Sequence, residues 1–178
     1  MGTAIVLNYL YLNPERVRAT IILSGTANFA EPVPRFIPQI LSYMDEKVKN
    51  LFIEIATTFL ATNKYPELRK LVREQLKRTP YFVFRRSLMN TVFAWKRDED
   101  LNDIKMPVLI MTGEKDILTT VKQSKKLNRL LPNSRLVILP GSRHDIPIEK
   151  GREVSDLIHE FVEFQIDRDK VRISSPNL

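Results

Sequence analysis

The chain has 178 residues and no cysteine, which excludes disulfides, thiolate catalysis and cysteine-bound metals. Its length fits one domain, and 43% hydrophobic with 28% charged residues is typical of a globular protein. A formal charge of +7 favours acidic partners but identifies no reaction by itself. No apolar run approaches the ~20 residues of a membrane helix, and no secretory signal follows Met1, so we expect a cytoplasmic protein.

The chain begins with a predicted helix, residues 3–12, that is apolar on almost every side. Such a helix is expected inside a protein rather than on its surface. Asn13 and Pro14 should end it, because proline cannot continue a helix and disfavours helical geometry in the residue before it. Residues 18–25 then form a short β-branched run closed by a glycine, which predicts a strand.

Residues 26–101 change character, and we call this segment the cap. Apolar side chains recur at helical spacing within residues 33–44, 48–59, 68–76 and 81–95, which predicts about four amphipathic helices and no strand. We therefore expect an all-helical insertion between two strands of a sheet. Most of its aromatic side chains should pack in its own core, while a minority line a cavity. These aromatic residues are Phe36, Phe52, Phe59, Phe82, Phe84, Phe93 and Trp95.

An alternating strand and helix pattern follows the cap. Residues 107–111 are a continuous apolar run between a proline and a glycine, typical of a parallel strand buried on both faces. Thr120 and Gln123 have capping-box spacing at the start of a helix. Residues 134–139 predict a third strand, and a last helix should begin near Ile148.

The predicted fold class is α/β, with three parallel strands, flanking helices and the helical cap. Residues 1–25 and 102–167 should make the core, and residues 168–178 a polar tail with frayed structure. We find no internal repeat.

Two side chains suited to proton transfer follow consecutive predicted strands. Asp116 lies just beyond strand 107–111, and His144 follows strand 134–139, where open α/β sheets place their chemistry. Alone, Asp116 reads as an ordinary turn aspartate, and the histidine 28 residues later (144 − 116) favours a functional pair instead. Histidine titrates near neutral pH, as a general base requires. His159, the other histidine, lies on the last helix, where we expect a structural role.

The order of elements and several phrases around them resemble the C-terminal half of the α/β-hydrolase superfamily. The phrases are Asn13-Pro14-Glu15-Arg16-Val17, Asp103-Ile104-Lys105-Met106-Pro107-Val108, Gly113-Glu114-Lys115-Asp116 and Gly141-Ser142-Arg143-His144. Met1 and Gly2 match the last two positions of the family's Gly-X-Ser-X-Gly nucleophile elbow. The resemblance implies that the nucleophilic serine lies one position before Met1, outside this sequence.

The same resemblance implies site residues. His144 would be the base of a catalytic triad and Asp116 its orienting acid, in the family's order of Ser, Asp and His. Asp145 competes as the acid, but its adjacency to His144 makes it a poor partner. Met1 would supply by position one backbone N–H of the oxyanion hole, provided that a residue precedes it. No cofactor and no metal are implied.

The implied function of the complete protein is a serine hydrolase acting on an ester or acyl bond of a small apolar substrate. The 178-residue chain alone should be inactive because it lacks the nucleophile. Strand 18–25 should be central in a complete sheet, so its exposed edge offers a route to self-association.

Other functions stay open. Epoxide hydrolases and haloalkane dehalogenases use an aspartate nucleophile, usually followed by tryptophan where Met1 stands, and haloperoxidases share the serine triad. The chain is also readable as a non-catalytic remnant or a basic binding module, because cations cluster on two predicted cap helices. These are Lys64, Arg69, Lys70, Arg73, Lys77, Arg78, Arg85 and Arg86. Interspersed Glu67 and Glu74 favour a solvated helix face over nucleic-acid binding.

Overall fold

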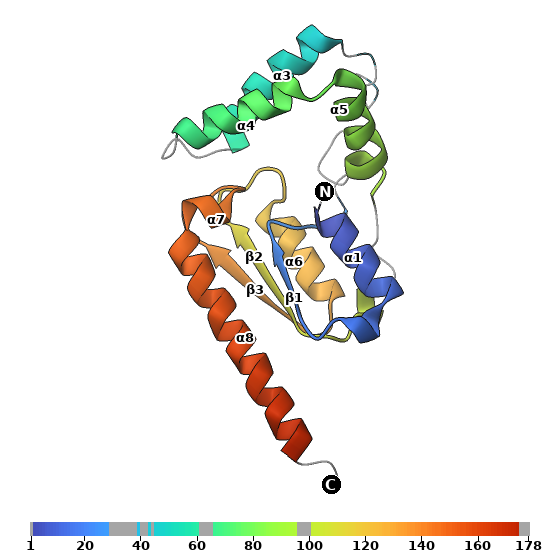
Figure 1. The fold of residues 1–178 in the computed structure, drawn as a ribbon, viewed down its shortest axis with the longest axis vertical. Coiled ribbons are helices and arrows are strands. Elements are labelled where there is room, and N and C mark those ends of the chain that lie inside the picture. The colour runs from blue at the N-terminus through green and yellow to red at the C-terminus, as the bar shows by residue number, and fades with distance from the viewer. Residues whose placement is uncertain are drawn as a thin grey trace.

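The structure is a computed structural model, which describes residues 2–28, 39, 43, 45–60, 66–95 and 101–174. Its centre is a parallel sheet of three strands in the order β1 (Thr20–Leu23), β2 (Val108–Gly113) and β3 (Ser134–Leu139). The cap is inserted between β1 and β2, which nevertheless lie side by side (Figure 1). The α/β fold class with three parallel strands is confirmed.

Strand β2 is buried on both faces, as its continuous apolar sequence predicts. All six of its residues are buried, and successive side chains point to opposite faces of the sheet. Val108 and Ile110 join a cluster with α1 (Gly2–Leu12) and α6 (Val121–Leu130). Leu109 and Met111 join a second cluster with the C-terminal helix α8 (Gly151–Ser174). Burial of each large apolar side chain stabilises the fold by roughly 1.5–3 kcal/mol.

Helix α1 packs on the sheet with one face only. Leu7 and Leu10 are buried against β1 and α6, whereas Ile5 and Leu12 are 64% and 63% exposed. The helix ends at Leu12, before a 3-10 turn over Pro14–Arg16, as the proline predicts. The other apolar face of α1 is left uncovered by the described part of the chain.

Helix α6 begins with the predicted capping box. The Thr120 hydroxyl accepts the backbone N–H of Gln123, and the Gln123 side chain accepts the backbone N–H of Thr120 at 2.9 Å. The Gln123 amide also donates to the backbone oxygen of Asn28 at 3.1 Å. The chain therefore packs on the core as far as Asn28, beyond the expected boundary at residue 25. At the other end of the cap, Leu101 is fully buried in the same core cluster.

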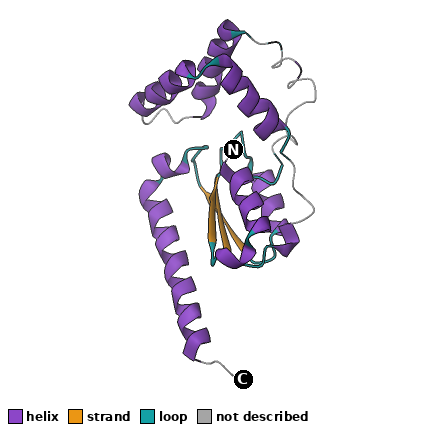
Figure 2. Cartoon of the chain, turned by 45° about the vertical axis from the view of Figure 1, so that its right-hand side comes forward, coloured by secondary structure: helices purple, strands orange, loops and turns teal. Residues whose placement is uncertain are grey.

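The described part of the cap is helical. It comprises α3 (Glu46–Leu60), α4 (Pro66–Arg78) and α5 (Tyr81–Ser87), which continues as a π-helical segment over Leu88–Phe93. The first predicted cap helix, in residues 33–44, lies outside the described residues apart from Gln39 and Tyr43, and so does Phe36. Figure 2 shows the three helices beyond the carboxyl ends of the strands.

Helices α3 and α4 are joined by a buried lysine. The Lys49 ammonium group donates to the backbone oxygens of Lys77 and Thr79, at 3.1 and 2.8 Å, and pairs with Glu46. It thereby satisfies carbonyl groups at the C-terminal end of α4, which have no partner within that helix. Trp95, expected among the cap aromatics, packs against the core cluster that contains α1.

The C-terminal region differs from the single helix expected to begin near Ile148. The chain forms a short helix α7 (Ile146–Glu149), leaves helical geometry at Lys150 and then begins α8. Residues 168–174, expected in the frayed tail, belong to α8.

A 3-10 turn over Leu101–Asp103 leads from the cap back to the core. Among the described helices, none is both long and apolar enough to cross a membrane.

Candidate active site

Two loops meet at the carboxyl edge of the sheet because β2 and β3 are adjacent and parallel. The loop after β2 carries Asp116 and the loop after β3 carries His144. Gly113 permits their close approach, since a Cβ atom there would lie 2.0 Å from the backbone oxygen of Arg143. The Lys115 N–H donates to the backbone oxygen of Ser142 at 2.8 Å, which joins the two loops directly.

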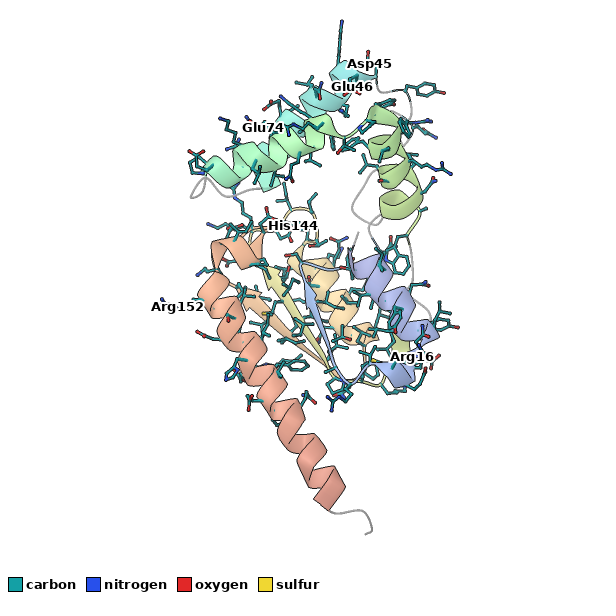
Figure 3. All side chains as sticks on the ribbon, in the orientation of Figure 1. Arg16, Asp45, Glu46, Glu74, His144 and Arg152 are labelled. Carbon is teal, nitrogen blue, oxygen red and sulfur yellow. The ribbon has the colours of Figure 1, made fainter. Side chains whose placement is uncertain are left out.

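The structure brings Asp116 and His144 into direct contact. Nδ1 of His144 lies 2.8 Å from Oδ2 of Asp116. The Asp116 side chain is fully buried, while 29% of the His144 side chain is exposed. Figure 3 shows His144 at the edge of the sheet that faces the cap. A proton on Nδ1, held by the carboxylate, leaves the lone pair of a neutral ring on Nε2, where it is available to an incoming group.

Asp116 accepts hydrogen bonds at both carboxylate oxygens. Oδ1 accepts the backbone N–H groups of Leu118 and Thr119, at 2.8 and 3.0 Å, and Oδ2 accepts the Thr119 hydroxyl at 2.7 Å. Burial is the largest single influence on the pKa of Asp116 and raises it. The hydrogen bond and charge of His144, together with the Thr119 bonds, outweigh burial and hold this pKa below its ordinary value. The carboxylate is therefore ionised at neutral pH.

The loop that carries His144 is held by three further side chains. The Glu114 carboxylate accepts the Gly141 N–H at 2.8 Å, and the Glu149 carboxylate accepts the Arg143 N–H at 3.0 Å. The Ser24 hydroxyl, from the end of β1, donates to the backbone oxygen of His144 at 2.7 Å. These three residues and Thr119 were missed by sequence reasoning. Thr119 alone has a local signal, because a hydroxyl three residues after an aspartate suits a side-chain-capped turn.

The remaining sequence-predicted residues lie away from the pair. Asp145 precedes α7 as its N-cap residue, and the described contacts of the His144 ring are with Asp116 and Thr119. His159 lies exposed on α8. Met1, the expected oxyanion-hole residue, lies outside the described residues. Within the described ranges, no group of three or more histidine, aspartate or glutamate side chains is arranged to hold a metal ion.

The basic cluster of the cap is partly neutralised by the cap itself. Glu54 of α3 pairs with Arg73 at 3.0 Å and with Lys77 at 2.5 Å, both on α4. The hydrogen bond from Lys77 is the main reason that the pKa of Glu54 lies below its ordinary value, and the charge of Arg73 adds to it. These cations join α3 to α4, so the cluster in part stabilises the cap. Lys64 lies outside the described residues.

A parallel sheet with an aspartate–histidine pair at its carboxyl edge, and a helical cap inserted before the strand of the aspartate, defines the class of α/β hydrolases. Residues 1–151 match the family described as serine aminopeptidase, S33. The chain belongs to this family, and the resemblance seen in the sequence is confirmed.

Two curated proteins are similar to most of the chain. The chain is 23% identical over 166 residues to carboxylesterase YbfK of Bacillus subtilis, covering 91% of this chain and 55% of the relative. It is 26% identical over 173 residues to the pimeloyl-[acyl-carrier protein] methyl ester esterase of Yersinia enterocolitica, covering 92% and 67%. The chain thus spans about half to two thirds of the length of these curated relatives.

Two solved structures support the fold. The structure of a hydrolase from Oleispira antarctica matches with a TM-score of 0.79 at 16% identity, covering 91% of this chain and 62% of that one. A second structure, an esterase from Thermogutta terrifontis, matches with a TM-score of 0.77 at 17% identity, covering 92% and 62%.

Proposed function

We propose that this chain supplies the acid and the base of a Ser-His-Asp triad in a hydrolase that cleaves an ester or acyl bond. The observation that carries the proposal is the 2.8 Å contact between the partly exposed His144 ring and the fully buried Asp116 carboxylate. Two curated esterases among its relatives support the type of bond. The nucleophile would be a serine directly before Met1, and the Met1 N–H would contribute to the oxyanion hole.

In the proposed reaction, Nε2 of His144 accepts the proton of the serine hydroxyl as the serine oxygen attacks the substrate carbonyl. Asp116 stays ionised and stabilises the imidazolium that forms, without taking up the proton itself. The imidazolium then donates its proton to the departing alkoxide, which leaves an acyl-enzyme. A water molecule, deprotonated by His144, releases the acid and restores the serine.

The cap would determine which acyl or alcohol groups enter. It lies beyond the same edge of the sheet as His144 (Figure 3). Ile117 and Leu118, directly after the acid, are 57% and 42% exposed and offer apolar surface beside the pair. We therefore propose a small apolar ester or acyl compound as substrate. A cytoplasmic location stays a prediction.

The test uses the natural polypeptide, meaning the full product of the reading frame that contains this chain. Its hydrolysis of p-nitrophenyl esters of increasing acyl length is measured for the parent protein and for His144→Ala. His159→Ala is the matched control, because it removes the other histidine at an exposed position on α8. We expect turnover to disappear with His144→Ala and to persist with His159→Ala. Equal turnover in both variants would show that the base is assigned wrongly.

A further inference from the structure

Ser24 stands in an unusual backbone conformation at the end of β1. Its φ angle is +49°, in the left-handed region that residues with a Cβ atom enter at a cost in free energy. Glycine adopts this conformation freely, and Gly25 is the next residue. The free-energy cost of a serine at this position therefore requires a compensating interaction.

The compensating interactions link three strands of the sheet. The Ser24 N–H donates to the backbone oxygen of Met111 at 2.8 Å, which extends the pairing of β1 with β2. The Ser24 hydroxyl donates to the backbone oxygen of His144 at 2.7 Å. Because His144 follows β3, this bond extends from the end of β1 past β2 to the loop of the third strand. Only 8% of Ser24 is exposed, so water competes little for the bond.

This bond differs from the others that hold the same loop. Glu114 and Glu149 bind the N–H groups of Gly141 and Arg143, which precede the histidine. Ser24 binds the carbonyl group of His144 itself. The histidine is then held at its backbone by Ser24 and at Nδ1 by Asp116. Because the histidine is held both at its backbone oxygen and at Nδ1 of the ring, the direction in which Nε2 points is fixed.

We propose that Ser24 is a positioning residue for His144, which keeps the imidazole in the tautomer and orientation that expose the lone pair on Nε2. The inference rests on the proposed function for its catalytic consequence. Its structural part, the effect of Ser24 on the ring of His144, stands on the hydrogen bonds alone. In the triad reaction, loss of this bond would lower kcat by about tenfold to a hundredfold, as small misplacements of a catalytic group do.

Two substitutions separate positioning from stability. Ser24→Gly removes the hydroxyl and also relieves the strained conformation, so we expect this variant to stay folded. Ser24→Ala removes the hydroxyl but keeps the strain. The matched control is Ser134→Ala, which removes a hydroxyl that donates to the backbone oxygen of Leu131 at 2.8 Å, at the opposite end of the sheet.

The measurement is nuclear magnetic resonance of the natural polypeptide labelled with ¹⁵N-histidine. Long-range ¹H–¹⁵N spectra report the tautomer of each ring, and the signals of His144 are identified by their loss in His144→Ala. We expect a single Nδ1–H tautomer with a hydrogen-bonded ring proton in the parent and in Ser134→Ala. Ser24→Gly and Ser24→Ala should show a mixture of tautomers and a weakened ring-proton signal. The exposed His159 should be unchanged in all variants.

A folded Ser24→Gly variant with the parent's His144 signals would overturn the inference, whether or not the protein cleaves esters. An unfolded Ser24→Gly variant, judged from its backbone amide spectrum, would also overturn it, because Ser24 would then be needed for stability instead. Altered His144 signals in a protein without esterase activity would support the inference and contradict the proposed function. In an active protein, Ser24→Gly should lower kcat and leave KM unchanged.

Discussion

Asp116→Asn replaces one carboxylate oxygen of the site with an amide NH2 group. The effect of this substitution follows from the hydrogen bonds of the Asp116 side chain. The asparagine oxygen can still accept the N–H groups of Leu118 and Thr119, as Oδ1 does in the parent. Its amide nitrogen then takes the place of Oδ2, 2.8 Å from Nδ1 of His144. An amide donates where the carboxylate accepts, so Nδ1 must become an acceptor and the ring proton must move to Nε2.

The resulting tautomer has no lone pair on Nε2, so His144 cannot take the proton of the serine. We expect kcat of the natural polypeptide to fall by up to ~10⁴-fold, the loss known for this substitution in serine proteases. That factor corresponds to about 5.5 kcal/mol in the activation free energy. Stability should change far less, because the two backbone bonds remain and a neutral amide costs less to bury than a carboxylate. We expect a loss of about 1.5–3 kcal/mol, the value of one hydrogen bond to a charged group.

The assay combines two measurements on the same preparation: kcat for a p-nitrophenyl ester from pH 5 to 9, and the free energy of unfolding in urea. Thr119→Val is a companion variant, because it removes the 2.7 Å hydroxyl bond to Oδ2 while the carboxylate and its bond to His144 remain. It should retain more activity than Asp116→Asn. An Asp116→Asn protein with the parent's kcat would refute the assignment of Asp116 as the orienting acid.

Three further predictions concern pH, loop packing and association. Since folding lowers the pKa of Asp116 below its ordinary 3.8, its ionised form stabilises the fold above that pH, and this contribution is lost as pH falls through the folded value. Urea unfolding between pH 2 and 6 should therefore depend less steeply on pH in Asp116→Asn, and equal slopes would contradict the pKa direction. Gly113→Ala should lower the free energy of unfolding in urea by about 1–3 kcal/mol, because the added methyl group forces the two site loops apart. Gly151→Ala, which has open space around its Cβ position, should not lower it. Equal effects of the two substitutions would contradict the close approach of the loops at Gly113. Besides the edge strand β1, the uncovered apolar face of α1 offers a surface for self-association of the 178-residue chain, so an Ile5→Ser, Leu12→Ser double variant should sediment more as a monomer. An equal gain from Phe82→Ser, which is exposed on the cap, would point to another surface.

The parts of the fold that sequence could predict have local signals. The continuous apolar run of β2, the proline after α1 and the capping box at Thr120 each depend on residues close together in the chain. The contact of Asp116 with His144 could be expected as well, because adjacent parallel strands deliver their following loops to one edge of the sheet.

Other features depend on contacts that no local pattern reports. The bond from Ser24 to His144 joins residues 120 positions apart and depends on a left-handed backbone that serine does not favour. The extension of the core to Asn28 depends on the side chain of Gln123, which belongs to another helix. The break between α7 and α8 falls at Lys150 and does have local signals, since Pro147 precedes it and Gly151 follows it directly, but the expectation of a single helix did not use them.

The central claim, that His144 activates a serine next to Met1, is tested most directly by covalent labelling. The natural polypeptide is treated with a fluorophosphonate, which reacts with activated serines, and the labelled peptide is identified by mass spectrometry in the parent protein, in His144→Ala and in His159→Ala. We predict one labelled serine, directly before Met1, with labelling lost in His144→Ala and retained in His159→Ala. Labelling that persists without His144, or that falls on a serine elsewhere in the chain, would contradict the account.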